Sequence, residues 1–168
     1  EAGIPAQLVE ATRERPYVVL LHATSRAEKQ WPVASWRELI DSLAAAGDRI
    51  VLPWGSDAEH EAARRLAAAH DACTVAPRLT LAQCAALIGG ASGVVGVDTG
   101  LTHLAAALDL PTVALFAATP AWRFGPYWTA RARGLGADGR WPQAAQVLAV
   151  LDELRRLPRT AARSPDRG

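Results

Sequence analysis

The feature of this sequence that most limits its fold is an alternation between short apolar runs and amphipathic segments of helical period. The first run, residues 17–21, reads Tyr-Val-Val-Leu-Leu. Continuous runs of β-branched and aliphatic residues are typical of strands that are buried on both faces, as in parallel sheets. The further strands expected are residues 49–52, 72–75, 93–97 and 111–116, the last of which is the last clear strand in the sequence.

The segments between these runs carry apolar residues at helical spacing. Residues 35–46 place Trp36, Leu39, Ile40 and Leu43 on one face and are closed by Gly47. The other expected helices are residues 57–70 with Asp57 as N-cap, a helix opened by Thr80 and closed by Gly89-Gly90, and residues 101–108 and 141–157. This alternation predicts an α/β fold, a Rossmann-like doubly wound parallel sheet. Such folds bind ligands at the carboxyl edge of the sheet, where the helices begin.

Composition narrows the class of protein. A chain of 168 residues can bury a core without disulfides or metal. Its formal net charge of +1 argues against a dedicated nucleic-acid-binding domain, and no apolar run approaches the length of a membrane span. Two cysteines cannot form a disulfide framework or an all-cysteine zinc site, and no cluster has metal-ligand spacing. The chain has no Met and begins Glu-Ala-Gly, so we expect a domain of a longer protein. Residues 1–16 are expected to form a linker or a short helix (residues 6–13) that enters the domain, residues 17–157 the domain and residues 158–168 a disordered tail.

Asp98-Thr99-Gly100-Leu101-Thr102-His103 directly follows a predicted strand and opens a helix. The glycine permits a tight turn and the close approach of a ligand. Free backbone N–H groups of the first helical turn, together with the helix dipole, form an anion site. The hydroxyls of Thr99 and Thr102 and the imidazole of His103 add donors. The segment therefore predicts a phosphate or diphosphate site, with a plain helix N-cap as the alternative.

Two more polar loops follow predicted strands at the same edge. In residues 22–29, Thr24 and Ser25 can donate to a phosphate, and Lys29 or Arg26 can neutralise it. In residues 54–59, Glu59 is a candidate ligand for ribose hydroxyls, as carboxylates are in dinucleotide folds. The alternatives are a solvated loop in the first case and an ordinary acid in the first turn of a helix in the second. The glycine fingerprints of P-loop, NAD-binding and α/β-hydrolase proteins are absent.

Several motifs resemble those of one family in order and spacing. They are Thr24-Ser-Arg-x-x-Lys-x-Trp-Pro32 with Trp36-Arg-Glu-Leu39, Leu52-Pro-Trp-Gly55, and Asp98-Thr-Gly-Leu-Thr-His-Leu-Ala-Ala-Ala-Leu108. Over residues 17–157 the chain resembles the C-terminal domain of the lipopolysaccharide heptosyltransferases. The second and third motifs look more like the heptosyltransferase I type, which adds the first heptose to Kdo, than the heptosyltransferase II type.

The resemblance implies one half of a two-domain GT-B glycosyltransferase that binds ADP-heptose and needs no metal or other cofactor. It implies that Lys29 meets the donor phosphates and stabilises the leaving ADP, with Thr24 and Ser25 beside it. By the same resemblance Asp98 holds heptose hydroxyls, Thr99, Gly100 and His103 bind the diphosphate, Glu59 takes the ribose, and Leu79 packs near the adenine. The resemblance also implies that the missing N-terminal domain binds the acceptor, Kdo-lipid A, and supplies the catalytic base. The whole enzyme is expected in the cytoplasm, at the inner face of the inner membrane of a Gram-negative cell.

Residues 116–120, Phe-Ala-Ala-Thr-Pro, depart from the family's Gly-Pro-Thr-Asp-like turn, which leaves only Thr119 for a donor contact there. Trp122, Tyr127 and Trp128 can frame a pocket or form a tucked aromatic cluster. Other functions also stay open. They are a non-catalytic ADP-binding module, half of a UDP-sugar transferase or epimerase and, less favoured without the glycine fingerprint, an NAD-dependent dehydrogenase.

Overall fold

The structure, a computed structural model, describes residues 3–13, 16–24, 29–68, 70–117, 129–137 and 139–159. The strands are β1 (Tyr17–Leu21), β2 (Arg49–Leu52), β3 (Cys73–Val75), β4 (Gly93–Val97), β5 (Thr112–Leu115) and β6 (Ala132–Leu135). The helices are α1 (Ala6–Arg13), α2 (Val33–Ala45), α3 (Asp57–Ala67), α4 (Leu81–Gly89), α5 (Gly100–Ala107) and α7 (Ala144–Arg156). In the part of the chain so described, no helix is both long and apolar enough to cross a membrane.

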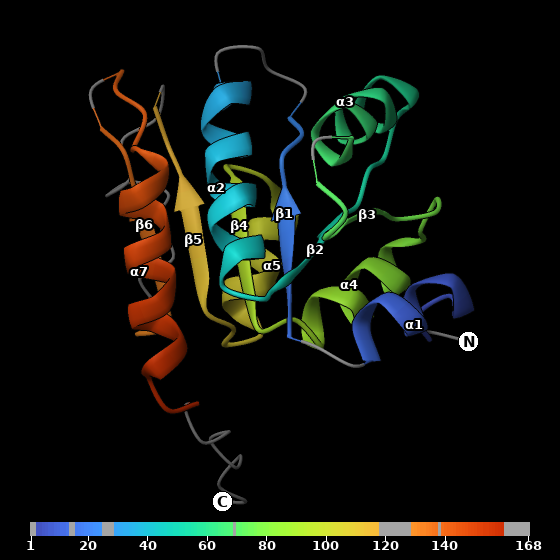
Figure 1. The fold of residues 1–168 in the computed structure, drawn as a ribbon. Coiled ribbons are helices and arrows are strands. Elements are labelled where there is room, and N and C mark those ends of the chain that lie inside the picture. The colour runs from blue at the N-terminus through green and yellow to red at the C-terminus, as the bar shows by residue number, and fades with distance from the viewer. Residues whose placement is uncertain are drawn as a thin grey trace, which may run out of the picture.

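The strands form a parallel sheet in the order β3-β2-β1-β4-β5-β6 (Figure 1). The chain starts in the middle at β1, moves outward to β3, and then crosses back to β4 and continues to the other edge. This is the strand order of dinucleotide-binding folds, in which the reversal between β1 and β4 opens a crevice at the carboxyl ends of the strands. The predicted Rossmann-like doubly wound fold is confirmed.

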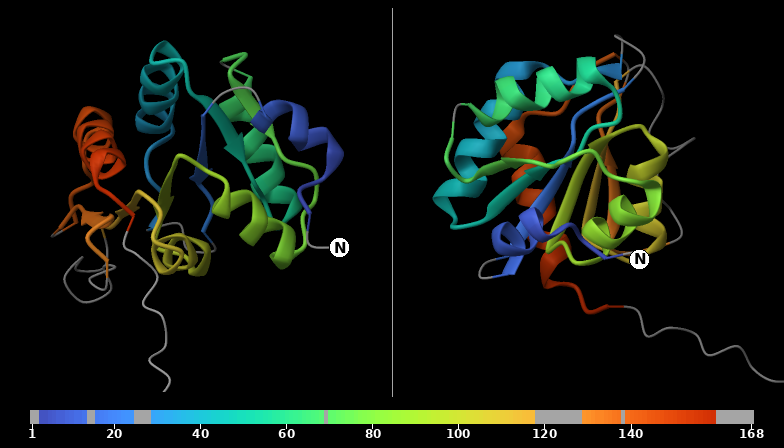
Figure 2. Two further views of the ribbon diagram at one scale, coloured as in Figure 1. Left: turned by 90° about the horizontal axis from the view of Figure 1, so that it is seen from below. Right: turned by 90° about the vertical axis from the view of Figure 1, so that its right-hand side faces the viewer.

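Helices cover both faces of the sheet. Helices α2, α3 and α7 pack on one face and α1, α4 and α5 on the other; Figure 2 (left) shows α2 and α7 on the side opposite α5. Alternation along β1 divides its side chains between the two layers, because Val18 and Leu20 face the first core while Val19 and Leu21 face the second. All five residues of β1 and of β4 are buried, which accounts for their uninterrupted apolar sequences.

The sequence prediction missed β6. This edge strand reads Ala-Arg-Gly-Leu, is at most half-buried, and pairs only with β5. Its position depends on backbone hydrogen bonds to one neighbour, such as the bond from the Phe116 N–H to the Leu135 carbonyl (2.8 Å), rather than on an apolar run. The sheet therefore continues past residues 111–116, the last strand that is clear in the sequence.

Several helix starts also differ from the prediction, and α2 begins at Val33 rather than at residue 35. Ser56, not Asp57, is the N-cap of α3, because its side chain and that of Glu59 form a reciprocal capping box with each other's backbone N–H groups. Helix α7 begins at Ala144 rather than at residue 141. Gly47 does close α2, at a φ of +90° that favours glycine. Residues 1–16 contain α1, whose Leu8 is buried in the second core; the division of the chain into linker, domain and tail stays a prediction.

Candidate functional site

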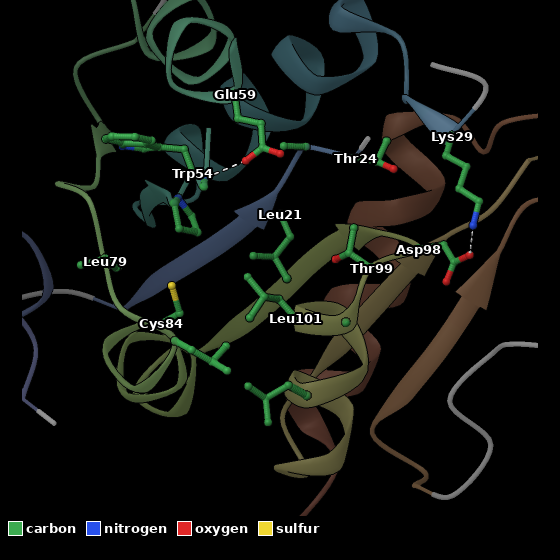
Figure 3. A pocket seen from close by; sticks show the side chains of 16 residues that line it. Leu21, Thr24, Lys29, Trp54, Glu59, Leu79, Cys84, Asp98, Thr99 and Leu101 are labelled. Carbon is green, nitrogen blue, oxygen red and sulfur yellow. Dashed lines mark hydrogen bonds and ion pairs between the residues drawn. The ribbon is translucent and has the colours of Figure 1, made fainter. Parts of the chain in front are cut away.

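A cavity of about 900 Å³ lies at the carboxyl edge of the sheet, at the reversal between β1 and β4. Its walls come from the segments that follow β1, β2 and β4 and from the first turns of α4 and α5. One end is polar and the other apolar, as Figure 3 shows with Lys29 and Asp98 on one side and Trp54, Leu79 and Cys84 on the other. The three loops singled out in the sequence thus meet in one cavity.

The polar end is built around the carboxylate of Asp98. Its Oδ2 atom accepts a hydrogen bond from Lys29 Nζ at 2.6 Å, and its Oδ1 atom lies 3.2 Å from His103 Nε2. Burial raises the pKa of this carboxyl, but the hydrogen bonds from Lys29 and His103 outweigh it, so the pKa lies below its usual value. Asp98 is therefore ionised at neutral pH and shares its charge with two neighbours.

The first turn of α5 presents backbone donors to the cavity. No described residue accepts a hydrogen bond from the backbone N–H of Gly100 or Leu101, as expected for the start of a helix. Gly100 does not have a positive φ, so the expected tight turn does not require glycine; a Cβ atom there would meet open space. The helix start thus leaves room for an anion to approach these N–H groups.

The two threonines of this turn differ in availability. Thr102 is buried and its hydroxyl donates to the Val97 carbonyl at 2.7 Å, so the expectation that it donates to a phosphate is wrong. Thr99 Oγ1 lies 3.2 Å from Thr102 Oγ1. Because the Thr102 proton is already used, Thr99 donates this bond. Thr99 lines the cavity, and its oxygen keeps lone pairs for a further partner.

Glu59 enters the cavity from α3 with one carboxylate oxygen already engaged. Its Oε2 atom accepts hydrogen bonds from the backbone N–H of Gly55 (2.7 Å) and of Ser56 (3.2 Å). The backbone carbonyl of Glu59 lies 3.2 Å from Nε2 of His22, whose pKa is lowered by burial. The neutral imidazole therefore donates to this carbonyl and connects the end of β1 to the start of α3.

The apolar end is an open wall rather than a closed core. Leu81, in the first turn of α4, is 72% exposed and lines the cavity with Leu79 and Leu101. Trp54 is fixed before any ligand arrives, because its Nε1 donates to the Ala76 carbonyl at 2.6 Å and its ring also stacks on an imidazole. Exposed aliphatic and aromatic surface at a cavity rim is suited to a flat, apolar ligand group such as a nucleobase.

That imidazole belongs to His60 of α3, and the two ring centroids are 4.2 Å apart. Cys84, at the same end, is buried, and burial raises the pKa of its thiol. It is therefore a neutral apolar side chain there rather than a nucleophile.

The structure places seven of the nine residues predicted for the site on the wall of this one cavity: Thr24, Lys29, Glu59, Leu79, Asp98, Thr99 and Gly100. His103 lies beside them through Asp98, and Ser25 falls outside the described residues. Arg26, Thr119, Trp122, Tyr127 and Trp128 are likewise outside them. In the described ranges no group of three or more His, Cys, Asp or Glu could hold a metal ion.

Sequence reasoning did not identify the side chains of Leu81, Leu101 and Leu104 as parts of the cavity wall. The helical period shows that such residues share a face but not whether protein covers that face.

The sequence model of glycosyltransferase family 9 (heptosyltransferase) matches residues 3–149. This chain belongs to that family. Lipopolysaccharide heptosyltransferase 1 of Pseudomonas aeruginosa is 48% identical over 132 residues, which are 79% of this chain and 37% of that protein. The resemblance to the heptosyltransferase family, inferred from three motifs, and to its type I members, inferred from two of them, is confirmed.

Solved structures agree with this assignment. The E. coli heptosyltransferase WaaC with ADP superposes with a TM-score of 0.78 and 40% identity, covering 85% of this chain and 45% of that one. WaaC with ADP-2-deoxy-2-fluoro heptose gives a TM-score of 0.74 at 40% identity, covering 84% of this chain and 44% of that one. The chain thus spans less than half the length of these relatives, and its fold is one half of the GT-B architecture.

Proposed function

We propose that this chain is the donor-binding half of an inverting lipopolysaccharide heptosyltransferase, which transfers L-glycero-D-manno-heptose from ADP-heptose to Kdo of the lipid A inner core. The observation that carries the proposal is the order of groups along one cavity. An apolar wall, a carboxylate, a helix start whose first N–H groups have no acceptor among the described residues, and a cation–carboxylate pair occur together, in the order that a base, a ribose, a diphosphate and a sugar require (Figure 3).

Each part of the donor then has a partner. The adenine packs at the apolar end beside Leu79, and Glu59 accepts hydrogen bonds from the ribose through the carboxylate oxygen that its capping box does not use. The diphosphate lies at the start of α5, against Thr99, Gly100 and the neighbouring His103. Thr24 and Ser25 complete the phosphate contacts.

In the proposed reaction an acceptor hydroxyl of Kdo attacks the anomeric carbon of the heptose while the bond from that carbon to the ADP oxygen breaks. Negative charge develops on the leaving diphosphate, and Lys29 stabilises it in the transition state. Asp98 orients the heptose by accepting hydrogen bonds from its hydroxyls. The acceptor's proton passes to a base in the domain that precedes this one. Because the acceptor is a lipid, we place the whole enzyme in the cytoplasm at the inner face of the inner membrane.

Calorimetry with ADP-heptose, ADP, UDP and NAD tests the proposal. We expect the chain to bind ADP-heptose in preference to the other three, weakly, and to transfer no heptose by itself. Lys29→Gln removes the cation and should weaken binding about tenfold, the effect of losing one charge-assisted contact. Arg37→Gln is the matched control, because it removes one positive charge from an exposed position on α2 outside the cavity wall.

The other outcomes contradict the proposal in different ways. Equal affinity for ADP and ADP-heptose would indicate an ADP-binding module without a transferase role. A preference for UDP would indicate half of another sugar-nucleotide enzyme, and a preference for NAD a dehydrogenase. Detectable heptose transfer by the chain alone would show that a base is present in it.

A further inference from the structure

Lys29 is the only lysine among the 18 lysine and arginine residues of the chain. Its side chain is 21% exposed and ends 2.6 Å from Asp98. A lysine side chain has four rotatable carbons, so its ammonium stays over one carboxylate only if the backbone at its base is fixed. The structure therefore raises the question of what fixes residue 29.

Two residues further along, Trp31 is anchored in the first core. It is 2% exposed, and its Nε1 donates to the backbone carbonyl of Pro142 at 3.0 Å, across 111 residues of sequence. The edge of its ring meets Trp36, with ring centroids 4.8 Å apart and planes at 84°. Pro142 lies just before α7, so this bond attaches the segment that carries Lys29 to the start of a helix that is itself buried against the sheet.

We propose that Trp31 is a positioning residue that holds Lys29 over the cavity through the hydrogen bond to Pro142. Two peptide units span at most about 7 Å, so a displacement of the indole moves the base of the lysine side chain by a comparable amount. A charge-assisted hydrogen bond is short and directional and weakens steeply when its donor moves. The part of this inference that concerns donor phosphates rests on the proposed function, whereas the part that concerns the Lys29–Asp98 pair does not.

Nuclear magnetic resonance with ¹³Cε-labelled lysine tests the ligand-free part, because a chain with one lysine gives one lysine signal. In the wild type the two Hε protons should be inequivalent, since the ammonium is held in one place. Trp31→Phe keeps an aromatic ring and removes the N–H donor; we expect the two protons to merge at the position seen in urea. Trp36→Phe is the matched control, because it changes an indole in the same core without removing the Pro142 bond, and should keep them separate.

Should Trp31→Phe not fold, β-(3-benzothienyl)alanine at position 31 gives the same test. It has nearly the shape of tryptophan with sulfur in place of the N–H group, so it removes the hydrogen bond with little change of volume. An unchanged lysine signal in this variant, or in folded Trp31→Phe, would overturn the proposal.

A binding cycle tests whether Trp31 acts through Lys29. With ADP as the probe, we expect Trp31→Phe to weaken binding about three- to tenfold in the wild-type background and less than about twofold in the Lys29→Gln background. A merely structural role would give the same factor in both backgrounds, and that result would refute the positioning role. If the wild type bound no ADP while Trp31→Phe still merged the lysine signals, the proposed function would fail and the positioning of Lys29 would stand.

Discussion

Replacing Asp98 by Asn should favour the binding of ADP over that of ADP-heptose. The substitution keeps the shape of the side chain and removes its charge. In the structure Lys29 is held by this carboxylate, so a diphosphate must draw the ammonium away from it or share it. Without the charge, Asp98 no longer competes with the diphosphate for Lys29, and it no longer repels the phosphates. The heptose, by contrast, loses an ionised acceptor for its hydroxyls.

The magnitude follows from the exposure of the pair. The side chains of Lys29 and Asp98 are 21% and 13% exposed. The free energy of their interaction should therefore lie between that of a surface ion pair, about 0.2–1 kcal/mol, and that of a well-formed charge-assisted hydrogen bond, about 1.5–3 kcal/mol. Asn still accepts a neutral hydrogen bond of roughly half that strength. A carboxylate about 6 Å from a phosphate at an effective dielectric constant of about 40 adds roughly 1.4 kcal/mol of repulsion. We expect Asp98→Asn to bind ADP about 3- to 30-fold more tightly than the wild type.

Calorimetric titration of both ligands at neutral pH and moderate ionic strength measures the two effects. The ratio of ADP-heptose affinity to ADP affinity should fall toward one in Asp98→Asn. Asp57→Asn, which removes an exposed carboxylate in the first turn of α3, controls for the change in net charge and should move neither affinity more than about twofold. Weaker ADP binding by Asp98→Asn would refute the reasoning, because it would mean that the carboxylate helps the phosphates rather than competing with them.

Further predictions concern the cavity wall, the strand behind it and pH. Glu59→Gln can keep the capping box, so the fold should persist while ADP binds about three- to tenfold more weakly and pyrophosphate binds as before in the same titration. Gly96→Ala would place a Cβ atom 2.9 Å from that of Leu21; we expect a loss of about 1–3 kcal/mol in urea unfolding and weaker ADP binding. The pKa of Asp98 is lowered in the folded state, so its ionised form stabilises the fold fully above about pH 4 and this contribution disappears as the pH falls further. In urea unfolding between about pH 2.5 and 6, the free energy of unfolding of Asp98→Asn should therefore fall less steeply with acid than that of the wild type.

The strands were the most predictable part of the fold. Those found at residues 17–21, 49–52 and 93–97 have the predicted bounds, because strands buried on both faces require continuous apolar sequence. Strand β6 could not be found this way, since an edge strand with Arg133 and Gly134 in its middle carries no such signal. Its pairing is a property of the backbone of β5, which only the assembled sheet reveals.

The location of the site was predictable for a topological reason. Parallel strands bring their carboxyl ends to one edge, so polar loops after three of them had to lie near one another. Which side chains pair within that edge was not predictable. Lys29 and Asp98 are 69 residues apart. The alternatives were a phosphate ligand or part of a solvated loop for Lys29, and part of an anion site or a helix cap for Asp98. Thr102 shows the same limit, because its hydroxyl turns back to Val97 rather than to the cavity.

The pairing within the ligand-free site also bears on how tightly the chain can bind a donor. Lys29 is engaged by Asp98, one oxygen of Glu59 by two backbone N–H groups, and the hydroxyl of Thr99 by Thr102. When a ligand replaces such a partner, one hydrogen bond is exchanged for another and the net gain is small. The N–H groups at the start of α5 are different, because no described residue accepts from them, so a phosphate there replaces none of these residues as a partner. Most of the affinity for a diphosphate should therefore come from the helix start, while the engaged side chains contribute selectivity. If the proposed function holds, we therefore expect the chain to bind its nucleotide weakly alone and to need further contacts from the whole enzyme for tight binding of the donor.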